Sequence, residues 1–141
     1  MVTASDVSDG AERVFEMNCA RLLGRQLPFF RSDLLQLVPG PFDLLTANPP
    51  YLTDREADDL AKIGWPEPDI ALRGGPDGTA VAGRLIREAA GRVRPGGWIC
   101  LEAAAPQFDH LAAFLDQAGF RLVEIGKDLG GRDRVISGRL G

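Results

Sequence analysis

The chain has 141 residues, of which 45% are hydrophobic and 26% charged, and its formal net charge is -4 at pH 7. This size and composition are typical of one globular domain with a sizeable core. The acidic balance and the scattered arginines argue against direct nucleic-acid binding. No apolar run reaches the roughly 18 residues of a membrane span, and the N-terminus lacks a signal-peptide pattern. We therefore predict a cytoplasmic protein without membrane association.

The cysteines and the single histidine give no sign of a metal site or of nucleophilic catalysis. Cys19 and Cys100 lie in apolar surroundings, far apart in sequence and outside any CxxC motif. We predict buried free thiols in a reducing compartment, and no metal. His110 falls on a predicted helix without an evident partner, and we expect no catalytic role for it.

Apolar spacing and turn residues predict strands that alternate with helices. Ser8 or Asp9 can cap the first long helix, Thr79 a later one, and Gly119 ends the last. The apolar run 42–47 is typical of a strand buried on both faces. In chain order we expect strand 2–6, helix 11–23, strand 27–30, strand 42–47, short helix 54–62, helix 79–93, strand 98–103, helix 107–118, and strands 121–125 and 134–139.

This alternation predicts a parallel α/β sheet with an antiparallel pair of strands at its edge. The glycines of 94–97 predict a turn before strand 98–103, and 126–133 a turn between the last two strands. Ligands of such sheets bind at the carboxyl ends of the strands. Asp6, Asp33 and Asn48 each fall at or just after a strand end, which makes them a candidate site.

The segment "FDLLTANPPYL" ends an apolar strand with Asn48, Pro49, Pro50 and Tyr51. A planar amide or aromatic amine is a poor nucleophile, so a site that alkylates it must hold both of its N–H groups. Asn48 offers a side-chain oxygen and Pro49 a carbonyl oxygen as acceptors. Pro50 fixes the direction of that carbonyl, and Tyr51 offers a flat surface for stacking. The segment therefore favours orientation and electrostatic catalysis at a planar nitrogen, although a rigid loop without function is the simpler alternative.

"FDLLTANPPYL" resembles the signature of amino-group methyltransferases that depend on S-adenosylmethionine. The segment "EPDIALRGGPDGTAV", at 67–81, is more specific and is similar to release-factor glutamine methyltransferases of the HemK/PrmC type. The resemblance covers essentially the whole chain, in order. Further matching segments are "VTASDVSDGA", "RSDLL", "RPGGWICLE" and "KDLGGRDRVISGRL".

This resemblance implies a Rossmann-like class I methyltransferase sandwich. It implies transfer of a methyl group from S-adenosylmethionine to the glutamine amide in the Gly-Gly-Gln motif of class 1 peptide chain release factors. Asp6 would hold the cofactor ribose, and Asp33 and Leu34 would flank the adenine. The site at Asn48, Pro49, Pro50 and Tyr51 would hold the glutamine amide, with Asn48 also next to the cofactor.

The chain departs from the family pattern at two places. The family's first strand, its glycine-rich cofactor turn and its N-terminal substrate-docking domain are not found in 1–141. That strand would be central in the sheet, between the strands that begin at Val2 and Phe42. The second departure is milder: "LEAAAPQ", at 101–107, has alanine where relatives usually have glycine after the acid. We therefore expect 1–141 to be a truncated part of the catalytic domain, inactive by itself.

Other readings remain open at this point. The chain can be a non-catalytic remnant or a binding module. The signature also fits a ribosomal-protein glutamine methyltransferase and, less well, a DNA adenine methyltransferase. A nucleotide-binding Rossmann module is disfavoured because no GxGxxG follows a first strand.

Overall fold

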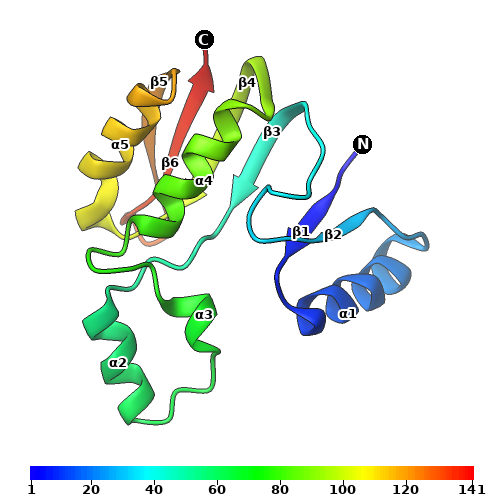
Figure 1. The fold of residues 1–141 in the computed structure, drawn as a ribbon, viewed down its shortest axis with the longest axis horizontal. Helices are drawn as coiled ribbons and strands as arrows, with labels where there is room; N and C mark the ends of the chain where they lie inside the picture. The colour runs from blue at the N-terminus through cyan, green and yellow to red at the C-terminus, as the bar shows by residue number, and fades with distance from the viewer. The chain divides into compact units, whose positions relative to one another are not determined.

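The first forty residues form a small β-α-β unit, Met1–Gly40. In this computed structural model, which describes residues 1–141, two short strands pair in parallel with Ala4 opposite Phe29. Their carboxyl ends therefore lie at the same edge. The elements of the unit are β1 (Ala4–Asp6), α1 (Asp9–Asn18), a π-helical segment (Cys19–Leu23) and β2 (Phe29–Arg31) (Figure 1).

The first helix is capped as predicted but is not regular to its end. The Ser8 hydroxyl oxygen accepts hydrogen bonds from the backbone N–H groups of Gly10 and Ala11, which satisfies two donors of the first turn. The predicted helix 11–23 continues beyond Asn18 only in π-helical geometry. Cys19, where that geometry begins, is buried as predicted. Cys100 is a free thiol too but only half-buried.

The second unit, Pro41–Gly141, is built on a four-stranded mixed sheet with the strand order β3-β4-β6-β5. β3 and β4 are parallel, whereas β4 and β5 both pair with β6 in antiparallel fashion. The predicted parallel sheet with an antiparallel terminal pair is confirmed. The strands are β3 (Phe42–Ala47), β4 (Val93–Glu102), β5 (Phe120–Lys127) and β6 (Asp133–Leu140).

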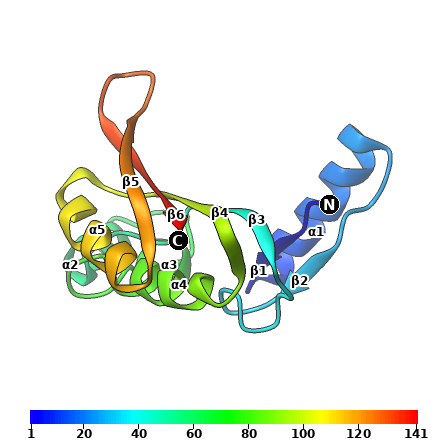
Figure 2. The ribbon, with the colours of Figure 1, turned by 90° about the horizontal axis from the view of Figure 1, so that it is seen from above.

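Helices α4 (Ala80–Ala90) and α5 (Phe108–Gln117) lie on one side of this sheet (Figure 2). The residues of the covered face lie opposite one another, with Leu45 paired to Ile99 and Leu101 paired to Ile136. All four side chains are buried. They meet buried side chains of the two helices, so the core of the unit is a single layer between sheet and helices. The helix residues in this layer are Ala82, Leu85, Ile86, Ala89, Leu111 and Leu115.

The expectation that strand 42–47 is buried on both faces is wrong for this unit. Its boundaries are as predicted, but Leu44 is 57% exposed while its neighbour Leu45 is buried. Side chains alternate between the two faces of a strand, and α4 and α5 cover only the face of Leu45. β3 pairs only with β4, and β1 only with β2.

The glycine turn predicted at 94–97 lies inside a strand. β4 begins at Val93, earlier than the predicted start at Trp98. Between the pairs Phe42–Val93 and Leu44–Trp98 the register shifts, so the extra residues form a bulge. Gly96 takes up the positive φ of 80° that this bulge needs. The last two strands are likewise longer than predicted.

Thr79 occupies the N-cap position of α4, as predicted, but its side chain makes no capping hydrogen bond. Both the N–H and the hydroxyl of Thr79 donate to Asp77 Oδ1, at 2.9 and 2.7 Å. These bonds lower the pKa of the Asp77 carboxyl. The hydroxyl is thus directed back into the preceding loop, and α4 begins at Ala80 without a side-chain cap. All helices are too short or too polar to span a lipid bilayer.

Replacement of Leu115 by alanine should lower the free energy of unfolding by about 2–5 kcal/mol, because it opens a cavity between α5 and the sheet. The Leu115 side chain is fully buried. Leu129→Ala is the matched control, since Leu129 is fully exposed in the β5–β6 turn. Urea unfolding followed by circular dichroism measures both. Equal effects of the two substitutions would contradict this description of the core.

Candidate active site

The Asn-Pro-Pro-Tyr segment begins at the carboxyl end of β3. The exposed Asn48 directly follows Ala47, which pairs with Leu101 of β4. This register places Asn48 next to Glu102 at the strand ends, where α/β sheets bind ligands. The Tyr51 hydroxyl donates a long hydrogen bond of 3.5 Å to Glu102 Oε1. Asn48, Tyr51 and Glu102 are thus brought together at one edge of the sheet.

A buried glutamine fixes the backbone of this segment. The Gln107 side chain is 6% exposed, and its Nε2 donates to the Tyr51 carbonyl oxygen at 2.6 Å. Its Oε1 accepts from the Ala104 backbone N–H at 3.1 Å. Both ends of the amide are therefore satisfied, as burial requires, and Gln107 ties the turn after β4 to the end of the Asn-Pro-Pro-Tyr segment.

Two glycines allow the chain to pack directly on this backbone. A Cβ at Gly74 would lie 2.7 Å from the Pro50 carbonyl oxygen, and one at Gly78 would overlap the Tyr51 carbonyl oxygen and Gln107 Nε2. Gly78 also has a φ of 76°. In addition, the Gly74 N–H donates to the Leu52 carbonyl oxygen at 2.7 Å. The segment "GGPDG" therefore encloses the two carbonyls that follow the first proline.

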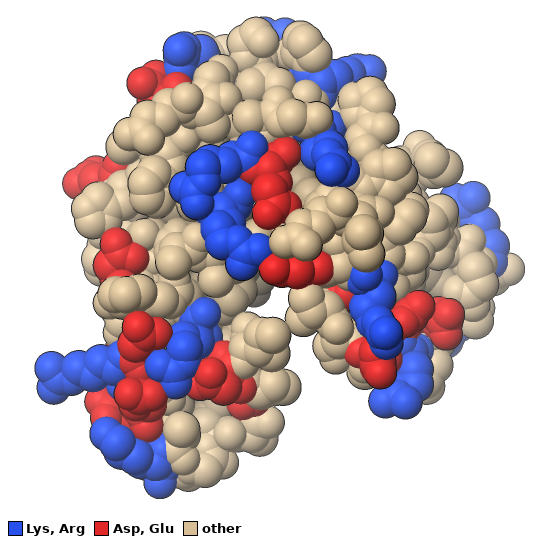
Figure 3. Space-filling view, in the orientation of Figure 1, with Lys and Arg blue, Asp and Glu red and all other residues tan.

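A flap of two short helices, residues 54–72, follows this segment (Figure 1). It contains α2 (Asp54–Lys62), with the predicted bounds, and α3 (Asp69–Leu72). Thr53 and Glu56 form a capping box at the start of α2, and hydrogen bonds from Thr53 lower the pKa of Glu56. In Figure 3, basic and acidic side chains are densely interleaved where Figure 1 places α2.

Arg73 ties the two helices of the flap together. Its guanidinium contacts the carboxylates of Asp58 at 2.7 Å, Asp69 at 2.8 Å and Asp54 at 3.3 Å. These bonds raise the pKa of Arg73, and the guanidinium lowers the pKa of Asp69. Since the Asp69 pKa is lowered by folding, its contribution to stability is present at neutral pH and is lost as the pH falls through that lowered pKa.

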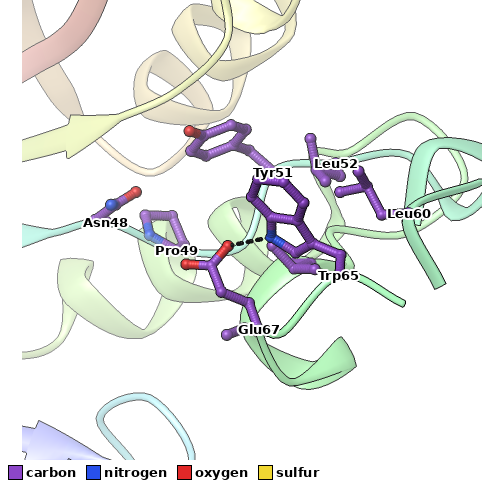
Figure 4. A pocket seen from close by; sticks show the side chains of 9 residues that line it. Asn48, Pro49, Tyr51, Leu52, Leu60, Trp65 and Glu67 are labelled. Atoms are coloured by element: carbon purple, nitrogen blue, oxygen red, sulfur yellow. Dashed lines mark hydrogen bonds between the residues drawn. The ribbon is translucent and has the colours of Figure 1, made fainter. Parts of the chain in front are cut away.

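A hollow of about 250 Å³ lies between the flap and the Asn-Pro-Pro-Tyr segment (Figure 4). Trp65 Nε1 donates to Glu67 Oε2 at 2.9 Å inside it. A second hollow, of about 230 Å³ on α4 and α5, contains no residue of a strand end, so the first is the better candidate for a ligand site. Its lining residues are Asn48, Pro49, Tyr51, Leu52, Leu60, Trp65, Glu67, Ala71 and Leu72.

The first unit holds the three other candidate residues. Asp6 is exposed at the end of β1, and its Oδ1 accepts from the Ser8 N–H at 2.8 Å. Asp33 is exposed after β2, and its Oδ2 accepts from the Gln36 side chain at 3.3 Å. The parallel pairing of β1 and β2 brings both carboxylates to one edge of this small sheet. These oxygens can accept hydrogen bonds from a polar ligand.

Leu34 has an unusual backbone conformation. Its φ is 51°, in the left-handed region that residues with a side chain rarely adopt. The half-buried Leu34 directly follows Asp33. Strained residues of this kind cluster at ligand sites, and the leucine side chain offers an apolar surface beside the Asp33 carboxylate.

Four residues of the second unit were missed as site residues in the sequence. Glu102 is an acid that ends an apolar strand, and this was the signal available for it. Trp65 and Glu67 stand in a segment rich in proline and glycine, where an aromatic side chain beside an acid is a weak signal. Nothing in the sequence around Gln107 indicates its contact with Tyr51, 56 positions away.

The chain is similar in sequence and in structure to known methyltransferases. No protein-family model matches the chain. The release factor glutamine methyltransferase of Deinococcus radiodurans is 38% identical over 138 residues, which are 98% of this chain and 49% of the relative. That of Cereibacter sphaeroides is 37% identical, over 97% of this chain and 50% of the relative. The ribosomal protein uL3 glutamine methyltransferase of Xylella fastidiosa is 33% identical, over 87% and 39%.

The chain thus spans about half the length of the curated relatives it matches. Solved structures support a class I methyltransferase fold. A methyltransferase from Pyrococcus furiosus has a TM-score of 0.73 at 18% identity, over 99% of this chain and 62% of the other. The Mtq2–Trm112 complex of E. cuniculi, responsible for methylation of the termination factor eRF1, has a TM-score of 0.59 at 22% identity, over 100% and 86%.

Replacement of Gly78 by alanine should destabilise the second unit by at least about 3 kcal/mol, since the collision with Gln107 and Tyr51 adds to the cost of a positive φ. Gly131→Ala is the matched control. Gly131 has a φ of 78°, but a Cβ there meets nothing within 4 Å, so about 1 kcal/mol is expected. Urea unfolding measures the loss of stability in both variants. Equal losses would contradict the close packing of Gly78 against Tyr51 and Gln107.

Loss of the Arg73 side chain should loosen the flap without unfolding the sheet. In Arg73→Gln, backbone amides of 54–72 should exchange hydrogen several-fold faster because three carboxylates lose their shared partner. Amides of β4 and β6 should be unaffected. Arg55→Gln, which removes a flap arginine that forms no ion pair, is the control. Hydrogen-exchange mass spectrometry that finds the same flap protection in both variants would contradict this role.

Proposed function

We propose that this chain, whose sequence belongs with the release factor glutamine methyltransferases over almost its whole length, forms part of an enzyme that methylates a glutamine side chain. The methyl donor would be S-adenosylmethionine, and the substrate the Gly-Gly-Gln motif of class 1 peptide chain release factors. The observation that carries the proposal is the exposed Asn48 on a segment whose backbone is held by Gln107, Gly74 and Gly78.

In this proposal the Asn-Pro-Pro-Tyr segment orients the substrate amide. The Asn48 side-chain oxygen accepts one amide N–H, and the Pro49 carbonyl oxygen accepts the other. The Tyr51 ring stacks on the amide plane. Because Pro50 fixes φ and Gln107 holds the Tyr51 carbonyl, these acceptors cannot relax away from the amide. They would favour the positive charge that develops on nitrogen as the N–C bond forms and the C–S bond of the sulfonium breaks to leave a neutral thioether, and the N–H proton would then pass to solvent water.

The residues of the first unit have side chains that suit the chemical groups of the cofactor. S-adenosylmethionine supplies an electrophilic methyl group on a sulfonium and carries a ribose with two hydroxyl donors. One oxygen of Asp6 is bound by the Ser8 N–H, which leaves Oδ2 for a hydroxyl. Asp33 would hydrogen-bond the adenine and Leu34 would pack on it. Among the structural neighbours, a Synechocystis methyltransferase contains bound SAM, which supports this choice of donor.

The proposed protein substrate rests on the names of the relatives. Two relatives are release factor glutamine methyltransferases, and the E. cuniculi complex acts on a termination factor. A second candidate, ribosomal protein uL3, is favoured by the Xylella fastidiosa relative. Both substrates present a glutamine amide, so the chemistry proposed at Asn48 is the same for either. Methylation assays with a purified release factor and with uL3 would separate them.

In the longest natural polypeptide that contains this sequence, Asn48→Ala should lower turnover by orders of magnitude with little change in cofactor affinity. The substitution removes an acceptor that acts on the reacting nitrogen. The mass of the endogenous protein, measured by immunoblot and intact mass spectrometry, defines which polypeptide to assay. Asn18→Ala, at an exposed position of α1, is the matched control. Turnover near that of the control would refute the orienting role of Asn48.

Asp6→Ala in the same polypeptide should instead weaken cofactor binding, raising the dissociation constant of S-adenosylmethionine at least about tenfold. The reason is the loss of charge-assisted hydrogen bonds. Calorimetric titration measures the affinity, and Asp109→Ala on the exposed surface of α5 is the control. If no cofactor binds even to the unsubstituted polypeptide, a non-catalytic binding module becomes the better interpretation.

A further inference from the structure

The hollow beside Asn48 combines apolar walls with one carboxylate. Leu52, Leu60 and Leu72 line it together with the Trp65 indole. The Glu67 carboxylate lies between Pro49 and the indole (Figure 4). A cavity of this kind suits a long side chain with an apolar stem and a charged end.

Glu67, unlike the four aspartates of the flap, has no cation partner. Asp54, Asp58 and Asp69 contact Arg73, and Asp59 contacts Lys62. Glu56 also lacks a cation partner, but two hydrogen bonds from Thr53 engage its carboxylate. Glu67 is bound only by the neutral indole N–H of Trp65. Its negative charge is therefore available to a ligand in the hollow.

The same hydrogen bond sets the position of Trp65. The indole Nε1 is tied to Glu67, while the side chain remains 49% exposed despite its large apolar surface. An exposed tryptophan held in place is a favourable contact for a binding partner. Its ring face attracts cations as well. Carboxylate and indole thus favour the same class of ligand, a cation.

We propose that this hollow is a subsite for a lysine or arginine side chain of the peptide substrate, within a few residues of the target glutamine. The apolar stem would lie along Leu60 and Leu72, and the charged end would meet Glu67 and Trp65. The inference rests on the proposed function, since Asn48 lines the same hollow. A peptide whose glutamine is held at Asn48 would present its neighbouring side chains there.

A neutral aliphatic side chain fits the hollow less well. It would cover the Glu67 carboxylate, removing water from a charge without supplying a partner, which is unfavourable. A basic side chain supplies that partner. The clamp of Arg73 on both flap helices holds the hollow in shape before the ligand arrives, which reduces the ordering cost of binding.

The test follows binding of short blocked peptides through the Trp65 indole N–H signal in an NMR titration of the 141-residue chain. Trp98→Phe assigns that signal, because the chain has 2 tryptophans. Each peptide has a central glutamine and a single lysine. Across the set, the lysine occupies in turn each of the three positions before and the three positions after the glutamine. Norleucine replaces the lysine in the matched peptides. In a third set, asparagine replaces the glutamine.

At one lysine position, binding should be about two- to fivefold tighter than with norleucine, as expected for an ion pair at an exposed carboxylate. Glu67→Gln should abolish this preference, because glutamine can still accept the Trp65 hydrogen bond but carries no charge. Glu124→Gln, at an exposed position of β5, should leave it unchanged. Equal affinity for lysine and norleucine at every position, a preference that survives Glu67→Gln, or no binding of any peptide would overturn the subsite.

The asparagine peptides separate this inference from the proposed function. If glutamine peptides bind better than asparagine peptides and no lysine is preferred, the amide site stands and the cationic subsite is wrong. A lysine preference that depends on Glu67, with glutamine and asparagine bound alike, supports the subsite and counts against the proposed function at Asn48.

Discussion

The hydrogen bond from Gln107 to the Tyr51 carbonyl is the interaction on which the candidate site depends. It joins the turn after β4 to the segment after β3, so the ends of the two parallel strands are held together by side chain as well as by the sheet ladder. The donor is buried and both ends of its amide are bound. An alternative path for the Asn-Pro-Pro-Tyr backbone would leave that amide unsatisfied, which is costly. Asn48 and Pro49 therefore present their acceptors from a fixed frame.

The glycines and Arg73 add two further sets of contacts around the Asn-Pro-Pro-Tyr segment. Gly74 and Gly78 bring a second stretch of backbone against the Pro50 and Tyr51 carbonyls, a distance that no side chain would permit. Beyond them, Arg73 gathers three carboxylates and holds the flap over one side of the segment. The first group of contacts is packing that tolerates no added atom. The second consists of partly exposed ion pairs, which are weaker and sensitive to pH. A rigid site beside a more labile flap is the result.

The first unit contributes a different kind of surface. Asp6 and Asp33 lie at one edge of a two-stranded parallel sheet. Leu34, which directly follows Asp33, has a positive φ. In the second unit, one face of β3 is uncovered, and Leu44 is exposed on this face, which α4 and α5 do not cover. Both units thus place polar candidate residues at the carboxyl ends of strands. This is the arrangement expected of a Rossmann-like methyltransferase fold.

Local sequence determined the elements whose signals are local. Strand 42–47 and helix 54–62 have the predicted bounds, because an apolar run and a capping box are complete within a few residues. The position of Asn48 at a strand end followed from the same signals. Tertiary structure alone decided that Gln107 binds Tyr51 and that Glu102 lies beside Asn48. It also decided that the glycines at 94–97 form a bulge, and that the Thr79 hydroxyl turns to Asp77. The first three depend on groups brought together by strand pairing across about fifty residues, and the last on loop geometry competing with a helix cap. Neither strand pairing nor loop geometry of this kind gives a repeating pattern of residues in the sequence.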